Sequence, residues 1–346
     1  MKRRFRNTAK VALVLVYLVI IAGAVVRMTG SGMGCPDWPK CFGYYIPPTD
    51  ISELQFKPNH DYKKGIVIIV DEELQVATKD FKSSGERNLQ NWEPYTEHDY
   101  AIFNPLHTWV EYINRLIGAL SGLPILIFTI MSIWLWKDKK RFLLLSIFTV
   151  LGMAFQAWLG KTVVDSNLAP YKITVHMVMA LVIVGVILYL IFLSKQTFRN
   201  QAFDSKFRNI LIIATCLTLI QIVLGTQVRQ FVDVQNKIYG YFNWDIQELA
   251  PINFYIHRSL SIVVLALNGW LFFRNKNLQL GYKKIKLVIV CIGLEILTGV
   301  IMYYFNFPFS SQPIHLVIAT ILIGFQFYII LESHNSQRLK PTKTSA

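Results

Sequence analysis

The sequence predicts an all-α protein that crosses a membrane several times, and three observations support this. Of its 346 residues, 53% are hydrophobic and only 16% are charged, whereas an ordinary soluble domain has about 25% charged residues. Eight apolar runs reach the roughly 20 residues that a helix needs to cross a bilayer. The basic residues lie in short clusters between these runs, which is typical of polytopic membrane proteins and not of proteins that bind nucleic acid.

The apolar runs predict the positions of the spanning helices directly. We expect eight helices, near residues 9–28, 106–136, 142–163, 173–194, 209–231, 252–273, 287–305 and 313–331. The first run follows Met1-Lys2-Arg3-Arg4 and therefore resembles a signal peptide, but no small-residue cleavage site comes after it. We interpret it as a retained helix.

The distribution of Lys and Arg predicts the orientation of the chain. The two ends and the segments after the second, fourth and sixth predicted helices hold 21 of the 35 Lys and Arg residues. Because positive charge is retained on the cytoplasmic side, both termini are expected in the cytoplasm. The opposite side would carry one long loop, about residues 29–104, with a strand-like segment at 66–70.

The two halves of the chain look like copies of one four-helix unit. The matched positions are 23–27 with 225–229, Asn114-Arg115 with His257-Arg258, and His176 with His315. Four spans return the chain to its starting side, so the two copies run in the same direction. We therefore expect two tandem four-helix bundles, residues 1–200 and 201–346, and such bundles hold cofactors between facing helices.

Four of the seven histidines stand at the outer ends of alternate predicted helices. They are His107, His176, His257 and His315, while His60, His98 and His334 lie in polar segments and are expected to be solvated. A single histidine in a span is more simply a hydrogen-bonded core residue. Four of them at one depth favour a functional site, because ionisable groups are costly inside a membrane.

Paired histidines in an apolar bundle favour haem over zinc. Zinc needs three or four ligands, and no Cys, Asp or Glu cluster completes such a set, whereas haem iron needs two axial imidazoles. Haem propionates would then need cations at the polar edge, where arginine suits carboxylates. The candidates are Arg27, Arg115, Arg229 and Arg258, and the alternative for each is interfacial snorkelling.

The two halves differ in their ligand sets. His257 and His315 form the stronger pair, whereas the position equivalent to His257 is Asn114 in the N-terminal half. Asparagine is a poor iron ligand, so His176 is the firm candidate there. His107, seven residues before Asn114 on the same helix face, is a second candidate partner.

Glu111 and a cysteine pair are further candidates in the N-terminal half. Glu111 has two interpretations: an ion pair with Arg115 four residues on, or a catalytic, proton-handling role. Cys35 and Cys41 are six residues apart in a Gly/Pro-rich loop on the outer side, where a disulfide is able to form. Such a bond could be a structural staple or redox-active, and the spacing favours neither.

With these residues the chain resembles the haem A synthase family over nearly its whole length. Residues 29–41 resemble the family's Thr-Gly-Ser-Gly-x-Gly-Cys-x-Asp-Trp-Pro-x-Cys element, and the segments 111–115, 156–160 and 221–225 also match. The resemblance implies that the methyl group of haem O is oxidised to the formyl group of haem A by successive O2-dependent hydroxylations. It implies a resident haem b held by His257 and His315, a substrate haem in the N-terminal half, and an essential acid at Glu111.

The resemblance also predicts the cellular context of the protein, and the chain departs from the family pattern at one position. It predicts a bacterial plasma-membrane protein with an unidentified electron donor, and haem O synthase and terminal oxidase assembly factors as partners. The family usually has histidine where this chain has Asn114, so the substrate haem is expected to be held by His176 alone or with His107.

Two other functions remain as alternatives. A membrane di-haem b-type cytochrome that carries electrons explains the histidines and arginines, but not Glu111 or the cysteine loop. A transporter built from two repeats would break its helices at mid-membrane in both halves, whereas Pro124 is the only proline well inside a predicted span.

Overall fold

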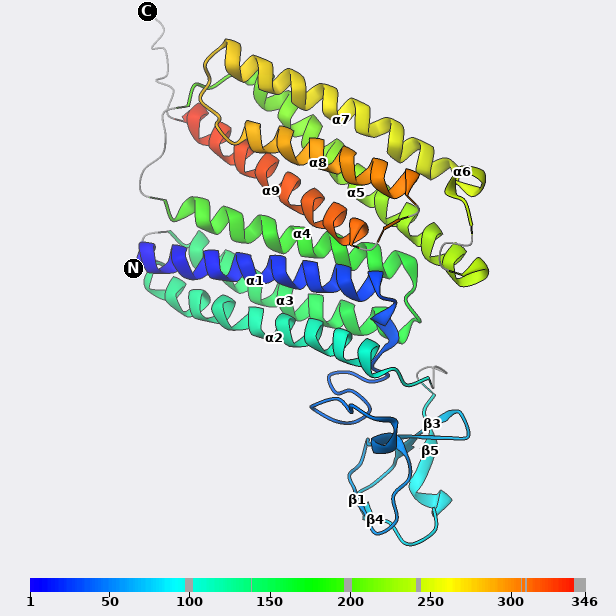
Figure 1. Ribbon diagram of the computed structural model, residues 1–346. Coiled ribbons are helices and arrows are strands. Elements are labelled where there is room, and N and C mark those ends of the chain that lie inside the picture. The colour runs from blue at the N-terminus through cyan, green and yellow to red at the C-terminus, as the bar shows by residue number, and fades with distance from the viewer. Residues whose placement is uncertain are drawn as a thin grey trace, which may run out of the picture. The chain divides into compact units, whose positions relative to one another are not determined.

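The computed structural model describes residues 1–96, 102–137, 139–195, 201–240, 244–305, 307–308 and 310–338 (Figure 1). Within these residues, eight helices are long and apolar enough to cross a membrane, which confirms the predicted fold class. They are α1 (Lys2–Met28), α2 (Pro105–Trp134), α3 (Arg141–Asp165), α4 (Pro170–Leu193), α5 (Ser205–Tyr239), α7 (Ile252–Asn277), α8 (Ile285–Tyr304) and α9 (Ser311–Arg338). The short helix α6 (Ile246–Leu249) precedes α7.

Helix α5 extends eight residues beyond its predicted end at 231. The apolar run marks only the part suited to hydrocarbon, whereas local polar contacts continue the helix to Gly240, whose φ of 84° ends it. Arg229 and Asp233 form an i,i+4 ion pair at 2.8 Å, and Trp244 Nε1 donates to Asn236 Oδ1 at 2.8 Å. Such pairs stabilise a helix where apolar burial no longer does.

The long outer loop is a small folded domain. Strands β2 (Val67–Val70), β3 (Glu73–Ala77) and β5 (Trp92–Pro94) form an antiparallel sheet in the order β2-β3-β5, and β1 (Asp61–Tyr62) pairs with β4 (Phe81–Lys82). The strand predicted at 66–70 is confirmed. Buried Tyr62, Ile68 and Trp92 give the domain its own apolar core. Single-turn 3-10 helices lie at Ser31–Met33, Ile51–Leu54 and Leu89–Asn91.

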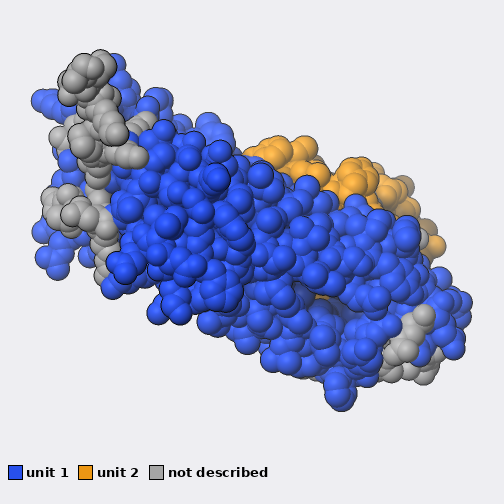
Figure 2. Space-filling model, turned by 90° about the horizontal axis from the view of Figure 1, so that it is seen from above, with its two compact units in different colours: residues 1–17, 121–153, 177–346 blue, residues 18–120, 154–176 orange. Residues whose placement is uncertain are grey.

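The chain divides into two compact units, coloured separately in Figure 2. Unit 1 comprises Met1–Tyr17, Ser121–Met153 and Met177–Ala346, and unit 2 comprises Leu18–Leu120 and Ala154–His176. Helices α1 to α4 are therefore each divided between the units, while α5 to α9 belong wholly to unit 1. The division into tandem bundles 1–200 and 201–346 stays a prediction.

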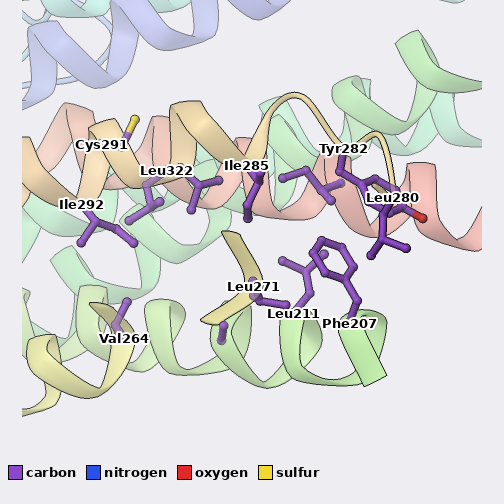
Figure 3. Close-up of a cluster of buried hydrophobic side chains, with 13 residues drawn as sticks. Phe207, Leu211, Val264, Leu271, Leu280, Tyr282, Ile285, Cys291, Ile292 and Leu322 are labelled. Atoms are coloured by element: carbon purple, nitrogen blue, oxygen red, sulfur yellow. The ribbon is translucent and has the colours of Figure 1, made fainter. Parts of the chain in front are cut away.

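Within unit 1, the four long C-terminal helices pack on one another. Helix α5 contacts α7 and α9, and α8 contacts the same two helices. A cluster of buried apolar side chains joins them (Figure 3), including Phe207 and Leu211 on α5, Leu271 on α7 and Ile285 on α8. Asp204 caps α5 by accepting from Phe207 N at 2.6 Å. These contacts fix the helices that carry His257 and His315.

Candidate functional site

His257 on α7 and His315 on α9 face each other in unit 1. Their ring centroids lie 6.4 Å apart and the ring planes are inclined by 66°. A metal–imidazole bond of about 2 Å, plus about 1 Å from that nitrogen to its ring centroid, separates the centroids of a bis-imidazole pair by about 6 Å. The observed separation therefore fits one metal ion held between the two rings, as haem iron is held by axial histidines.

Gln221 on α5 fixes the position and tautomer of His257. The Nδ1 atom of His257 lies 3.2 Å from the backbone oxygen of Gln221, and this oxygen can only accept, so Nδ1 carries the hydrogen. The side-chain Nε2 of Gln221 also donates to the backbone oxygen of His257 at 2.6 Å. The Nε2 atom of His257 is thereby left with its lone pair free for a metal.

Glu295 and Thr298 on α8 do the same for His315. Nδ1 of His315 lies 3.0 Å from Glu295 Oε2 and 2.8 Å from Thr298 Oγ1. Because the Thr298 hydroxyl donates to the Leu294 oxygen at 2.9 Å, it accepts from Nδ1, which leaves Nε2 of His315 free. Metal-binding histidines usually have such a partner on the second nitrogen. Neither Glu295 nor Thr298 was expected in the site from the sequence.

On a neighbouring helix, a glycine faces three of the candidate histidines and Asn114. A β-carbon would lie 3.2 Å from His257 Cε1 at Gly225, 3.4 Å from His176 Cε1 at Gly160, and 3.8 Å from His315 Cε1 at Gly299. At Gly23 it would lie 3.8 Å from Asn114 Oδ1. The sequence signal for Glu295 was therefore available: Glu295 and Gly299 are spaced as Gln156 and Gly160 are, and as Gln221 and Gly225 are.

The N-terminal half-site, in unit 2, is built on the same plan but is incompletely satisfied. Gln156 Nε2 on α3 donates to the backbone oxygen of His176 at 3.0 Å, as Gln221 does for His257. Among the described residues, however, His176 Nδ1 and Asn114 Oδ1 are both buried and have no hydrogen-bond partner. Buried polar atoms in this condition are rare and call for an explanation such as an absent ligand.

His107 lies in the first turn of α2, away from Asn114. Asn104 Oδ1 accepts from its backbone N at 3.3 Å, and a β-carbon on Gly34 would stand 2.5 Å from its backbone oxygen. Seven residues separate it from Asn114, which is about 10 Å along a helix. The structure thus packs the backbone of His107 against the cysteine loop. Binding of iron by the His107 side chain stays a prediction.

Glu111 and Arg115 on α2 bind the cysteine loop. Cys35 and Cys41 form a disulfide, as predicted, and both are buried. Glu111 is 4% exposed and its Oε2 accepts from Cys35 N at 2.9 Å, while its Oε1 pairs with Arg115. Arg115 also donates to the backbone oxygens of Asp37 at 2.6 Å and Lys40 at 2.9 Å. The ion pair of Glu111 with Arg115 is therefore present, and the burial of Glu111 is also compatible with a proton-handling role.

The other candidate arginines have different surroundings. Arg258 lies over the rings of Phe254, Tyr255 and Tyr303, at 5.9, 5.4 and 5.9 Å, and is next to His257. Arg229 is paired with Asp233, and Arg27 is half-buried in the last turn of α1. Binding of propionates by any of the four arginines stays a prediction.

Two of the histidines expected to be solvated lie outside these sites. His60 is exposed in the outer domain, where its ring meets Tyr62 edge-on at 4.8 Å. His334 is exposed near the end of α9. His98 lies outside the described residues.

Comparison with known proteins connects this geometry to a family. The family model described as "Cytochrome oxidase assembly protein" (COX15-CtaA) matches residues 6–82 and 70–327. The chain is 24% identical to the Heme A synthase of Wolbachia pipientis wMel, over 92% of this chain and 89% of that protein. It is 23% identical to the Heme A synthase of Rickettsia prowazekii (strain Madrid E), over 94% and 97% respectively. The Heme A synthase of Shewanella oneidensis is 27% identical over 62% of this chain and 54% of that protein.

Proposed function

Because this chain belongs to the cytochrome oxidase assembly protein family (COX15-CtaA), we propose that it is a haem A synthase. The substrate would be haem O, and the product haem A, with a ring methyl group oxidised to a formyl group by successive O2-dependent hydroxylations. The relatives named Heme A synthase cover nearly the whole chain. They support an oxidoreductase of haem A biosynthesis, and the hydroxylation route is our proposal.

One observation carries the haem-binding part of this proposal: the His257–His315 pair with both Nδ1 atoms engaged. Two fixed imidazoles whose Nε2 atoms are both free suit a permanently bound haem b. When bound, haem b would supply one-electron redox chemistry. Gln221, Glu295 and Thr298 would hold the two rings in place, and Arg258 stands beside His257 for a propionate.

The N-terminal half-site is proposed to hold the substrate haem. His176 would bind its iron from one side, and Asn114, a poor iron ligand, would leave the opposite side free for O2. Glu111 would handle protons at the reacting methyl, because it lies three residues from Asn114 on the same helix face. Arg27 and Arg115 are the cationic candidates for propionates in this half, and Arg229 is the further candidate in the other.

The basic clusters support a cytoplasmic location of both termini, in a bacterial plasma membrane. The outer domain and the disulfide would then face the oxidising side. An electron donor is required, and haem O synthase and oxidase assembly factors are the proposed partners, since they would supply haem O and use haem A.

Pigment extraction from the purified protein tests the function. We expect haem b together with haem O or haem A, identified by chromatography and mass spectrometry. Haem b alone, in protein from cells that make haem O, would favour the di-haem cytochrome. A His257→Ala protein that retained haem O but lost haem b would assign the two pigments to the two halves.

A further inference from the structure

A groove in unit 1 lies between α4, α5 and α9, and the α9 residues that line it come 12 to 19 residues after His315. It has a volume of about 390 Å³ and is open to the surface. Its lining residues besides Arg208 are Tyr189 on α4, Ile212 on α5, and Phe327, Ile330, Leu331 and His334 on α9. Most of this lining is apolar, and Ile212 is 41% exposed. A groove of this kind is suited to a hydrocarbon chain.

The mouth of the groove is cationic. Arg208, in the second turn of α5, also lines it, and Arg141 Nη1 donates to the Tyr189 hydroxyl at 3.5 Å. In the part of the chain that the structure describes, the Arg208 side chain contacts neutral groups: the amide oxygens of Gln337 and Asn209 and the ring of Phe203.

The carboxylate nearest in sequence is already committed elsewhere. Asp204, one turn before Arg208, accepts from Arg274 Nε and Nη2, both at 2.8 Å. These hydrogen bonds from Arg274 hold the pKa of Asp204 below its usual value, so the pair is fully ionised at neutral pH. The charge of Arg208 therefore meets only neutral partners among the described residues, and its remaining N–H donors can serve an external anion.

We propose that this groove binds an anionic phospholipid, with an acyl chain along Ile212, Ile330 and Leu331 and the phosphate at Arg208. A guanidinium presents a fork of donors that matches phosphate oxygens. Arg208 stands at the start of α5 and Leu331 near the end of α9, where spanning helices emerge. Basic pockets between helices at this level are recognised binding places for anionic headgroups. The lipid would lie between α4 of the N-terminal half and α5 and α9 of the C-terminal half.

Binding is measured by titrating dioctanoyl phosphatidylglycerol into the purified full-length protein in detergent and following its melting temperature. We expect a saturable rise for the wild type, and about fivefold weaker binding for Arg208→Gln, as one lost cation near a membrane surface implies. Dioctanoyl phosphatidylcholine should bind the wild type more weakly. Lys286→Gln removes an exposed charge on α8, outside the groove, and should bind like the wild type.

A second variant tests the groove itself. Ile212→Trp places a large ring in the groove without changing charge, and it should weaken binding of phosphatidylglycerol and phosphatidylcholine alike. The proposal is overturned if phosphatidylglycerol gives the same titration with wild type, Arg208→Gln and Ile212→Trp. It is also overturned if inorganic phosphate alone reproduces the shift, because the groove would then have no part in binding.

Discussion

The two candidate haem sites share one plan and differ in how completely it is satisfied. In the C-terminal half, both ring Nδ1 atoms have partners and the two imidazoles lie at a separation that fits one metal ion. In the N-terminal half, Asn114 takes the place of one imidazole, and His176 Nδ1 and Asn114 Oδ1 are buried without partners. The difference concerns the candidate ligands themselves, because Gln221 Oε1 and Glu295 Oε1 in the C-terminal half are also buried without partners. A site whose two imidazoles are both held suits a resident cofactor. A site with one ligand position unfilled suits a substrate that must enter, react with O2 and leave.

The largest expected effect comes from removing an axial ligand in the preorganised half. His257→Ala or His315→Ala should abolish binding of haem b, because one lost imidazole leaves the iron without its axial pair. The low-spin absorption spectrum of the purified protein measures this. His60→Ala, in the outer domain, is the matched control and should keep the full spectrum. Retention of that spectrum by His257→Ala would refute the assignment.

Glu111→Gln is expected to stop turnover in the other half while substrate stays bound. General acid–base catalysis typically contributes about 10²–10⁴-fold, so haem A should fall by at least about 100-fold. The amide oxygen of Gln can still accept from Cys35 N, which keeps the loop contact. Haem A and haem O per mole of protein give the two readings, and Glu248→Gln is the control. Normal haem A from Glu111→Gln would exclude Glu111 from the mechanism.

The sequence predicted those features that depend on local pattern. The apolar runs located eight helices, and the loop motif predicted the disulfide of Cys35 and Cys41, because both depend on residues close in the chain. The pairing of His257 with His315 followed from the repeat. The partners of their Nδ1 atoms did not, because Glu295 and Thr298 reach His315 only once α8 and α9 are packed.

Arg115 shows why charge near a predicted site is weaker information. Binding of a propionate by Arg115 stays a prediction. The structure shows that its donors contact Glu111, as the i,i+4 spacing allowed, and the backbone oxygens of the cysteine loop, which the sequence did not predict. The path of that loop depends on close approaches such as Gly34 against His107. The outer domain was likewise expected as a loop with one strand, because its strands pair residues up to 21 positions apart, such as Asp61 with Lys82.

Glu295→Gln should have an intermediate effect, confined to the resident haem. Loss of an outer partner of a metal-binding histidine typically lowers metal affinity or activity 10–100-fold, so we expect haem b to be released more readily, not absent. Gln occupies the equivalent position beside two other histidines, as Gln156 beside His176 and Gln221 beside His257. The Glu295→Gln variant is therefore expected to fold. Haem b transfer to apomyoglobin measures the change, and Thr298→Val should act in the same direction. An unchanged transfer rate in both variants would show that His315 needs neither partner.

The smallest effect on haem content, and the sharpest test of the comparison, is expected from Asn114→His. Gly23 faces position 114 as Gly160, Gly225 and Gly299 face histidines, at distances of the same range, so an imidazole should fit there without moving α1. If O2 needs the open position, filling it with His should give a second low-spin haem and less haem A. A variant with more haem A would show that Asn114 lowers activity.

His107 decides the remaining alternative for the ligands of the substrate haem. About 10 Å of helix separates it from position 114, and its backbone is packed against Gly34, so we expect His107→Ala to retain haem A formation and His176→Ala to lose it. Equal loss in both would mean that the substrate haem sits nearer the outer surface, between His107 and His176.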